Sequence, residues 1–85
     1  MTEEEFRKVP FKMMSHLSLE HEHRTTYVNE DYGFGINTYT SRWDDYTIGR
    51  AYVHYIYNDV VYKTRAKFLE AIKDVELLKQ ENYDL

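Results

Sequence analysis

The sequence predicts an α+β fold in which a four-stranded antiparallel meander sheet lies between an N-terminal and a C-terminal helix. Three observations support it: a helix-capping pattern followed by apolar residues at helical spacing, two-residue periodicity in the middle, and a second amphipathic stripe near the end. The predicted connections between strands are too short for crossover helices, so neighbouring strands should run antiparallel. We expect both helices to pack on one face of the sheet, in a single domain spanning residues 1–85.

The N-terminal helix is predicted to begin after Thr2, because Thr2 and Glu5 match the spacing of a capping box. Apolar residues then recur every three or four positions and form one stripe: Phe6, Val9, Met13 and Leu17. Pro10 interrupts this stripe, and proline inside a helix removes a hydrogen bond and clashes with the preceding turn. We therefore expect a helix that is kinked, or split in two, at Pro10.

Four strands are predicted in the middle of the chain, where residues of different character alternate. The expected ranges are 19–27, 32–41, 46–57 and 60–63, and turn-forming residues such as Asn58 and Asp59 separate them. If both helices cover one face of this sheet, the other face is left to solvent or to a partner.

The C-terminal helix is predicted to begin after Thr64, a residue type that is favoured at N-caps. Its apolar stripe consists of Phe68, Ala71, Ile72, Val75 and Leu78. Oppositely charged residues at a spacing of three lie on the other side of the helix. We therefore expect Phe68 and Ile72 to be core residues.

Composition and charge limit the compartment and the partners. The chain has no cysteine, which excludes disulfides and thiolate metal sites and fits a reducing compartment. Its apolar runs are far too short to span a membrane, so we expect a cytoplasmic protein without membrane contact. The net charge of −4 disfavours nucleic acid as a partner, because a phosphate backbone attracts basic surfaces.

Aromatic and acidic residues are concentrated in the same part of the chain. Ten of the fourteen aromatic residues lie between Tyr27 and Tyr62, and residues 19–62 carry seven acidic against three basic residues. The segment 39–46 combines residue types that are enriched at binding hot spots. The predicted partner-binding residues are Tyr39, Arg42, Trp43, Asp44, Asp45, Tyr46 and, on the third strand, Tyr52. The alternative is that Trp43 folds back and closes the end of the core.

A second candidate site lies at the start of the C-terminal helix. Basic residues in a first helical turn oppose the helix dipole, so their presence asks for a reason. Lys63, Thr64, Arg65 and Lys67 could hold a phosphate or carboxylate there, with tyrosines stacking on the ligand. The alternative is that these side chains pair with acids such as Glu70 or Asp59.

Histidines suggest a third possibility, a metal-dependent hydrolase. His21 and His23 are two residues apart and His54 could approach from another strand, which would supply three zinc ligands. Hydrogen-bonded histidines across the sheet explain the same pattern more simply, so we predict no metal site.

The leading hypothesis is a small intracellular protein-binding module that occludes a surface on a larger partner and is not an enzyme. One version is an acidic inhibitor or regulator of a nucleic-acid-binding protein, of the kind made by phages and mobile elements, whose carboxylates take the place of phosphates. No nucleophile, phosphate-loop or cofactor motif is present in the sequence, so we predict no cofactor. Whether the protein is a monomer or a homodimer stays open, as does the identity of the partner.

Overall fold

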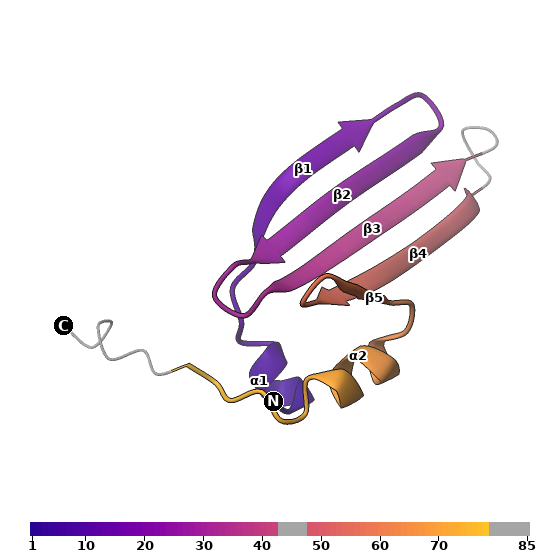
Figure 1. Cartoon of the computed structure of the whole chain (residues 1–85). Coiled ribbons are helices and arrows are strands. Elements are labelled where there is room, and N and C mark those ends of the chain that lie inside the picture. Colours follow the sequence, from indigo (N-terminus) through magenta and orange to yellow (C-terminus); the bar gives the residue numbers. More distant parts are fainter. Residues whose placement is uncertain (43–47, 79–85) are drawn as a thin grey trace.

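A five-stranded antiparallel sheet forms most of the structure, and two short helices lie at one of its ends (Figure 1). The computed structural model describes residues 1–42 and 48–78. The elements are α1 (Glu3–Phe6), β1 (Lys12–Ser18), β2 (Glu22–Asn29), β3 (Phe34–Arg42), β4 (Ile48–Tyr57), β5 (Val60–Tyr62) and α2 (Arg65–Ala71). Each strand pairs with its neighbour in sequence. The α+β class and the antiparallel meander are therefore confirmed, whereas the predicted number of four strands was wrong.

The additional strand is β1, in residues that we predicted to form the second half of the N-terminal helix. α1 ends at Phe6, before Pro10, and the chain continues as a strand from Lys12. The stripe residues Met13 and Leu17 are 59% and 47% exposed, so no core contact supports a helix there. The prediction of a helix kinked or split at Pro10 was therefore wrong beyond the first turn.

Pairing with β2 fixes the strand conformation of β1. The two strands pair along β1, with one extra residue, Met14, at a bulge. Side chains also bond across the pair: His16 Nδ1 lies 2.8 Å from Thr25 Oγ1, and Ser18 Oγ lies 3.0 Å from His23 Nδ1. The backbone of residues 12–18 therefore bonds across to β2, and the side-chain contacts add to this pairing, where the apolar spacing had suggested hydrogen bonds within a helix.

Both predicted helix N-caps are confirmed. The Glu5 N–H donates to Thr2 Oγ1 at 3.1 Å, and the Thr2 N–H donates to Glu5 Oε1 at 2.9 Å, which completes the capping box. The Lys67 N–H donates to Thr64 Oγ1 at 3.2 Å at the start of α2. Helices of four and seven residues are too short to form alone in water, so these caps and the packing of the helices on the sheet hold them.

Replacing Glu5 with glutamine tests the capping box through the pH dependence of stability. Hydrogen bonds from Thr2 lower the pKa of Glu5 below its ordinary value of 4.5. A carboxyl group with a lower pKa in the folded chain stabilises the fold above its unfolded pKa, and this contribution is lost as the pH falls through the folded pKa. We expect the free energy of unfolding of the original protein to fall more steeply than that of Glu5→Gln between about pH 5 and pH 3. Urea unfolding at several pH values measures both profiles, and parallel profiles would contradict this role.

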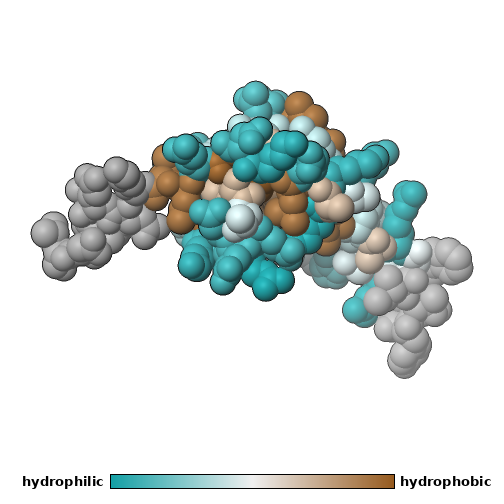
Figure 2. All heavy atoms as spheres, turned by 90° about the horizontal axis from the view of Figure 1, so that it is seen from below, coloured by the Kyte–Doolittle hydropathy of each residue, from teal (hydrophilic) through white to brown (hydrophobic). Residues whose placement is uncertain are grey.

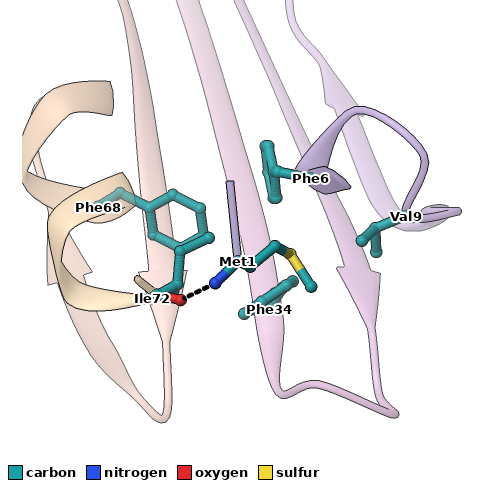
Figure 3. Close-up of a cluster of buried hydrophobic side chains, with 6 residues drawn as sticks. All are labelled: Met1, Phe6, Val9, Phe34, Phe68 and Ile72. Atoms are coloured by element: carbon teal, nitrogen blue, oxygen red, sulfur yellow. Dashed lines mark hydrogen bonds between the residues drawn. The ribbon is translucent and has the colours of Figure 1, made fainter. Parts of the chain in front are cut away.

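The core lies where the two helices meet the end of the sheet (Figure 3). Phe68 on α2 lies at its centre, with its ring centroid 5.1 Å from that of Phe6, 5.6 Å from Phe34 and 5.1 Å from Tyr55. Both helices therefore pack on the face of the sheet that carries Phe34, as expected, but only at its end. The buried apolar residues are Met1, Phe6, Val9, Phe34, Phe68 and Ile72.

The N-terminal residue links the two helices. The Met1 side chain is buried in the core, and its ammonium group donates hydrogen bonds to the carbonyl groups of Ile72 and Lys73 at 2.8 and 2.7 Å (Figure 3). Carbonyl groups at the end of a helix lack partners within the helix, so the ammonium group satisfies two acceptors next to α2.

The far end of the sheet, near the β1–β2 turn, is not covered by a helix on either face in the described part of the chain (Figure 1). All seven residues of β1 are exposed. Large apolar side chains are exposed beside this turn, at Leu17 and Leu19, and elsewhere on the sheet, at Met13, Met14 and Val53. The sheet thus has one end that is built into the core and one end that projects into solvent.

Candidate binding surface on the helix-free face of the sheet

The strand register decides which side chains share the face opposite the helices. Phe34 lies on the helix side, so Asn37 and Tyr39 point to the other face, because side chains alternate along a strand. Tyr39 pairs with Arg24 on β2 and with Tyr52 on β4. One rung across three strands therefore places Arg24, Tyr39 and Tyr52 side by side on the helix-free face.

These side chains stack on one another. The Tyr39 and Tyr52 rings lie 4.9 Å apart at an angle of 15°, and the Tyr52 and His54 rings lie 4.2 Å apart at 23°. The Arg24 guanidinium lies over the Tyr39 ring, 5.2 Å from its centroid, and donates to Glu22 Oε1 at 2.9 Å. We call Arg24, Tyr39, Tyr52 and His54 the aromatic row.

The aromatic row lies outside the core. None of its residues belongs to the buried cluster or to the half-buried apolar residues packed against that cluster, and Tyr52 is 38% exposed. Stacked aromatic pairs stabilise a sheet by about 0.5–1.5 kcal/mol each, so the row has a structural role as well. That contribution is small compared with the cost of removing a core residue. Folding therefore depends little on the row, and its side chains are available to bind a partner.

A buried amide oxygen lies beside the row. Asn37 Oδ1 is inaccessible to solvent and has no hydrogen-bond partner among the described residues. Asn37 lines a shallow depression of about 240 Å³, together with Arg24, Thr26, Tyr39, Tyr52 and others. An unsatisfied buried acceptor costs about 1–3 kcal/mol, so this oxygen calls for a partner such as a water molecule or a ligand group.

Basic side chains outnumber acidic ones on the described part of this face. On the helix-free face, the fully charged side chains among the described strand residues are Lys12, Glu22, Arg24 and Arg50, with Lys63 directly after β5. Among these Glu22 is the single acid, and it is bonded to Arg24. The helix end carries both signs, with the acids Glu3, Glu4, Glu5, Glu30, Asp31, Glu70 and Asp74 and the bases Arg7, Lys8, Arg65, Lys67 and Lys73. Seen from that end, hydrophilic side chains cover much of the surface between apolar patches (Figure 2).

The predicted partner-binding residues are only partly described. The structure brings Tyr39 and Tyr52 together, and it places Arg42 at the end of β3, where its N–H donates to the His21 carbonyl at 2.8 Å. The others, Trp43, Asp44, Asp45 and Tyr46, lie outside the described residues. Sequence reasoning did not include Arg24 among its candidates and considered His54 only as a metal ligand, because their position in the row depends on the register of the strands.

The predicted ligand site at the start of α2 is spread out. The Thr64 hydroxyl already accepts the Lys67 N–H, and Lys63 instead lines a depression beside Arg50. The Arg65 guanidinium donates to the Tyr55 hydroxyl at 3.2 Å and lies 3.4 Å from a Glu3 carboxylate oxygen. The hydrogen bond to Tyr55 is the main cause that raises the pKa of Arg65, and Glu3 contributes in the same direction to a smaller extent. Arg65 therefore ties α2 to α1 and to the sheet.

The three histidines of the proposed metal site do not meet. His23 pairs with Thr40 and points to the helix side, whereas His54 pairs with Asn37 and points to the helix-free face. His21 lies in the β1–β2 turn. Among residues 1–42 and 48–78, no group of three or more histidine, aspartate or glutamate side chains is arranged to hold a metal ion.

Two further observations concern membrane-spanning helices and similarity to known proteins. Neither α1 nor α2 is long and apolar enough to cross a membrane. Comparisons of the chain with protein-family models, with curated proteins and with solved structures give no match.

Proposed function

We propose that this protein is a binding module that occludes a surface on a larger partner protein through the helix-free face of its sheet. The observation that carries this proposal is the aromatic row, in which tyrosine, histidine and arginine side chains stack on an open sheet face away from the core. Tyrosine and arginine are the residue types that recur at the energetic centres of protein interfaces.

The charge of this face argues for a partner surface that is acidic. Arg24, Arg50 and Lys63 lie on or beside the row, and Glu22 is already bonded to Arg24. Charges of opposite sign on the partner would raise the association rate and fix its orientation. The version in which carboxylates imitate phosphates stays a prediction, and the described residues of this face do not favour it.

Affinity capture tests the proposal. The protein is immobilised and incubated with lysate of the cells in which it is made, and bound proteins are identified by mass spectrometry. We expect a specific partner that binds the original protein and is lost with Tyr39→Ala/Tyr52→Ala. The absence of any stable partner would count against a protein-binding function. Sedimentation of the purified protein tests the separate prediction of a homodimer.

A nucleotide or other small anionic ligand is the second candidate. Arg50, Tyr52, His54 and Lys63 line one depression of about 380 Å³, which combines aromatic rings with cations. A nucleotide bound there would stack on the tyrosine and place its phosphates near the cations. If this function holds, millimolar nucleotide should raise the melting temperature, and Arg50→Ala/Lys63→Ala should abolish the increase. A melting temperature that is independent of nucleotide would remove this candidate.

A further inference from the structure

We propose that an extended acidic segment of the partner binds as an added strand along the free edge of β4. This inference rests on the protein-binding function proposed above. β4 has ten residues, but β5 pairs only with residues 55–57. The chain then leaves the edge at Lys63 and Thr64 to begin α2 (Figure 1). In the described part of the sheet, residues 48–54 therefore have no strand on that side.

An unpaired strand edge recognises another polypeptide through its backbone. Its outward N–H and C=O groups can bond to an extended segment, and side chains at alternate positions then supply specificity. Arg50, Tyr52 and His54 belong to the helix-free face, whereas Ala51 and Val53 point to the opposite face, where Val53 is 43% exposed. An added strand would thus meet cationic and aromatic groups on one face and apolar groups on the other.

The side chains along this edge favour an acidic occupant. The depression beside the edge is lined by Arg50, Ala51, Tyr52, His54 and Lys63, without an acidic residue. Within the described part of the chain, neither Arg50 nor Lys63 forms an ion pair. A strand with carboxylates at every second position would place them next to these two cations.

The same charges argue against a second copy of this chain as the occupant. The described edge strands β1, β4 and β5 contain no acidic residue, so none of them offers a carboxylate to Arg50 or Lys63. Pairing β4 with β4 of a second copy would bring two arginines to the same edge, and like charges on neighbouring strands are destabilising. Single-stranded nucleic acid could use the tyrosines and cations, but it would leave the backbone groups of the edge unused.

A displayed library of random twelve-residue peptides tests the proposal on the full chain. Peptides are selected for binding to the original protein, and those that also bind the variant Arg50→Glu/Lys63→Glu are removed. The matched control is Lys8→Glu/Lys67→Glu, which changes two exposed lysines near the helices and alters the net charge by the same amount. The strongest selected peptide is then synthesised in an unmodified form and in two N-methylated forms, which carry the methyl groups on the odd-numbered and on the even-numbered backbone nitrogens.

We expect the selected peptides to carry acidic residues at alternate positions. The synthesised peptide should bind Arg50→Glu/Lys63→Glu at least tenfold more weakly than the original protein, and should bind the control unchanged, because the charge pairing is local. Hydrogen exchange by NMR should show protection of amides within residues 48–54. At least one of the two N-methylated forms should lose binding, because it keeps the side chains but blocks the hydrogen bonds.

Failure to select any acidic peptide, or protection of β1 amides in place of β4 amides, would overturn the added-strand proposal. Binding of a twelve-residue oligothymidine to the row, without any peptide, would overturn both proposals. If a captured partner shields Tyr39 and Tyr52 while residues 48–54 exchange as before, the protein-binding function stands and only the added strand fails.

Discussion

Replacing Phe68 with alanine should lower the free energy of unfolding by about 3–5 kcal/mol, which is typical of a buried phenylalanine. The Phe68 side chain is completely buried and contacts rings from α1, β3, β4 and β5. A domain of this size has about 4–13 kcal/mol of total stability, so the change removes a large part of it. We expect the melting temperature, followed by circular dichroism, to fall by more than about 10 °C.

The matched control is Val53→Ala, which removes an apolar side chain that is 43% exposed on β4. Because this residue stays partly exposed and does not pack on the core, its truncation should cost less than about 1 kcal/mol. Ile72→Ala, which truncates the other fully buried side chain, should resemble Phe68→Ala. Equal melting temperatures for Phe68→Ala and Val53→Ala would show that the core is not at the helix end.

The double substitution Tyr39→Ala/Tyr52→Ala should abolish partner binding and leave the protein folded. These two residues form a cross-strand pair with stacked rings, and neither contacts the core. Losing the pair should cost about 0.5–1.5 kcal/mol of stability beyond the change in buried area. Truncating an aromatic residue at the centre of an interface costs 2 kcal/mol or more of binding energy, so the two together should weaken binding by more than about 100-fold.

The control for this experiment lies on the opposite face of the same strands. Thr38→Ala/Val53→Ala also changes a β3–β4 cross-strand pair, but these side chains point to the helix side. Capture of the partner should be retained by this variant and lost by Tyr39→Ala/Tyr52→Ala. Loss of binding with both variants would point to a general disturbance of the sheet, and retention with both would place the interface elsewhere.

The sequence predicted the meander correctly from turn residues and alternation, but it failed at β1. The apolar stripe that suggested a long helix joins residues from two separate elements. Phe6 and Val9 are buried in the core, whereas Met13 and Leu17 lie on an exposed strand. The helical spacing of these apolar residues was therefore a coincidence. Before Pro10 they belong to the core, and after Pro10 they belong to an exposed strand. The pairing of β1 with β2 is a tertiary interaction that local periodicity does not report.

The aromatic row was predictable only in part. Tyr39 and Tyr52 were expected at an interface from their residue type, but the stack with Arg24 and His54 follows from the pairing of three strands. A slip of one residue in either pairing would move Tyr39 away from its neighbours or onto the other face. Other tyrosines of the aromatic-rich segment between Tyr27 and Tyr62 lie outside the row. Several half-buried ones pack against the core: Tyr32, Tyr55, Tyr57 and Tyr62.

The one-sided placement of the core gives the two ends of the sheet different local stabilities. Few buried apolar contacts hold the strand ends near the β1–β2 turn, so these ends should open and reclose without global unfolding. The helix end meanwhile keeps the hairpins anchored. A partner that docks on the projecting end would then contact strands that can change their twist. Ordering these strand ends on binding would reduce the net binding free energy.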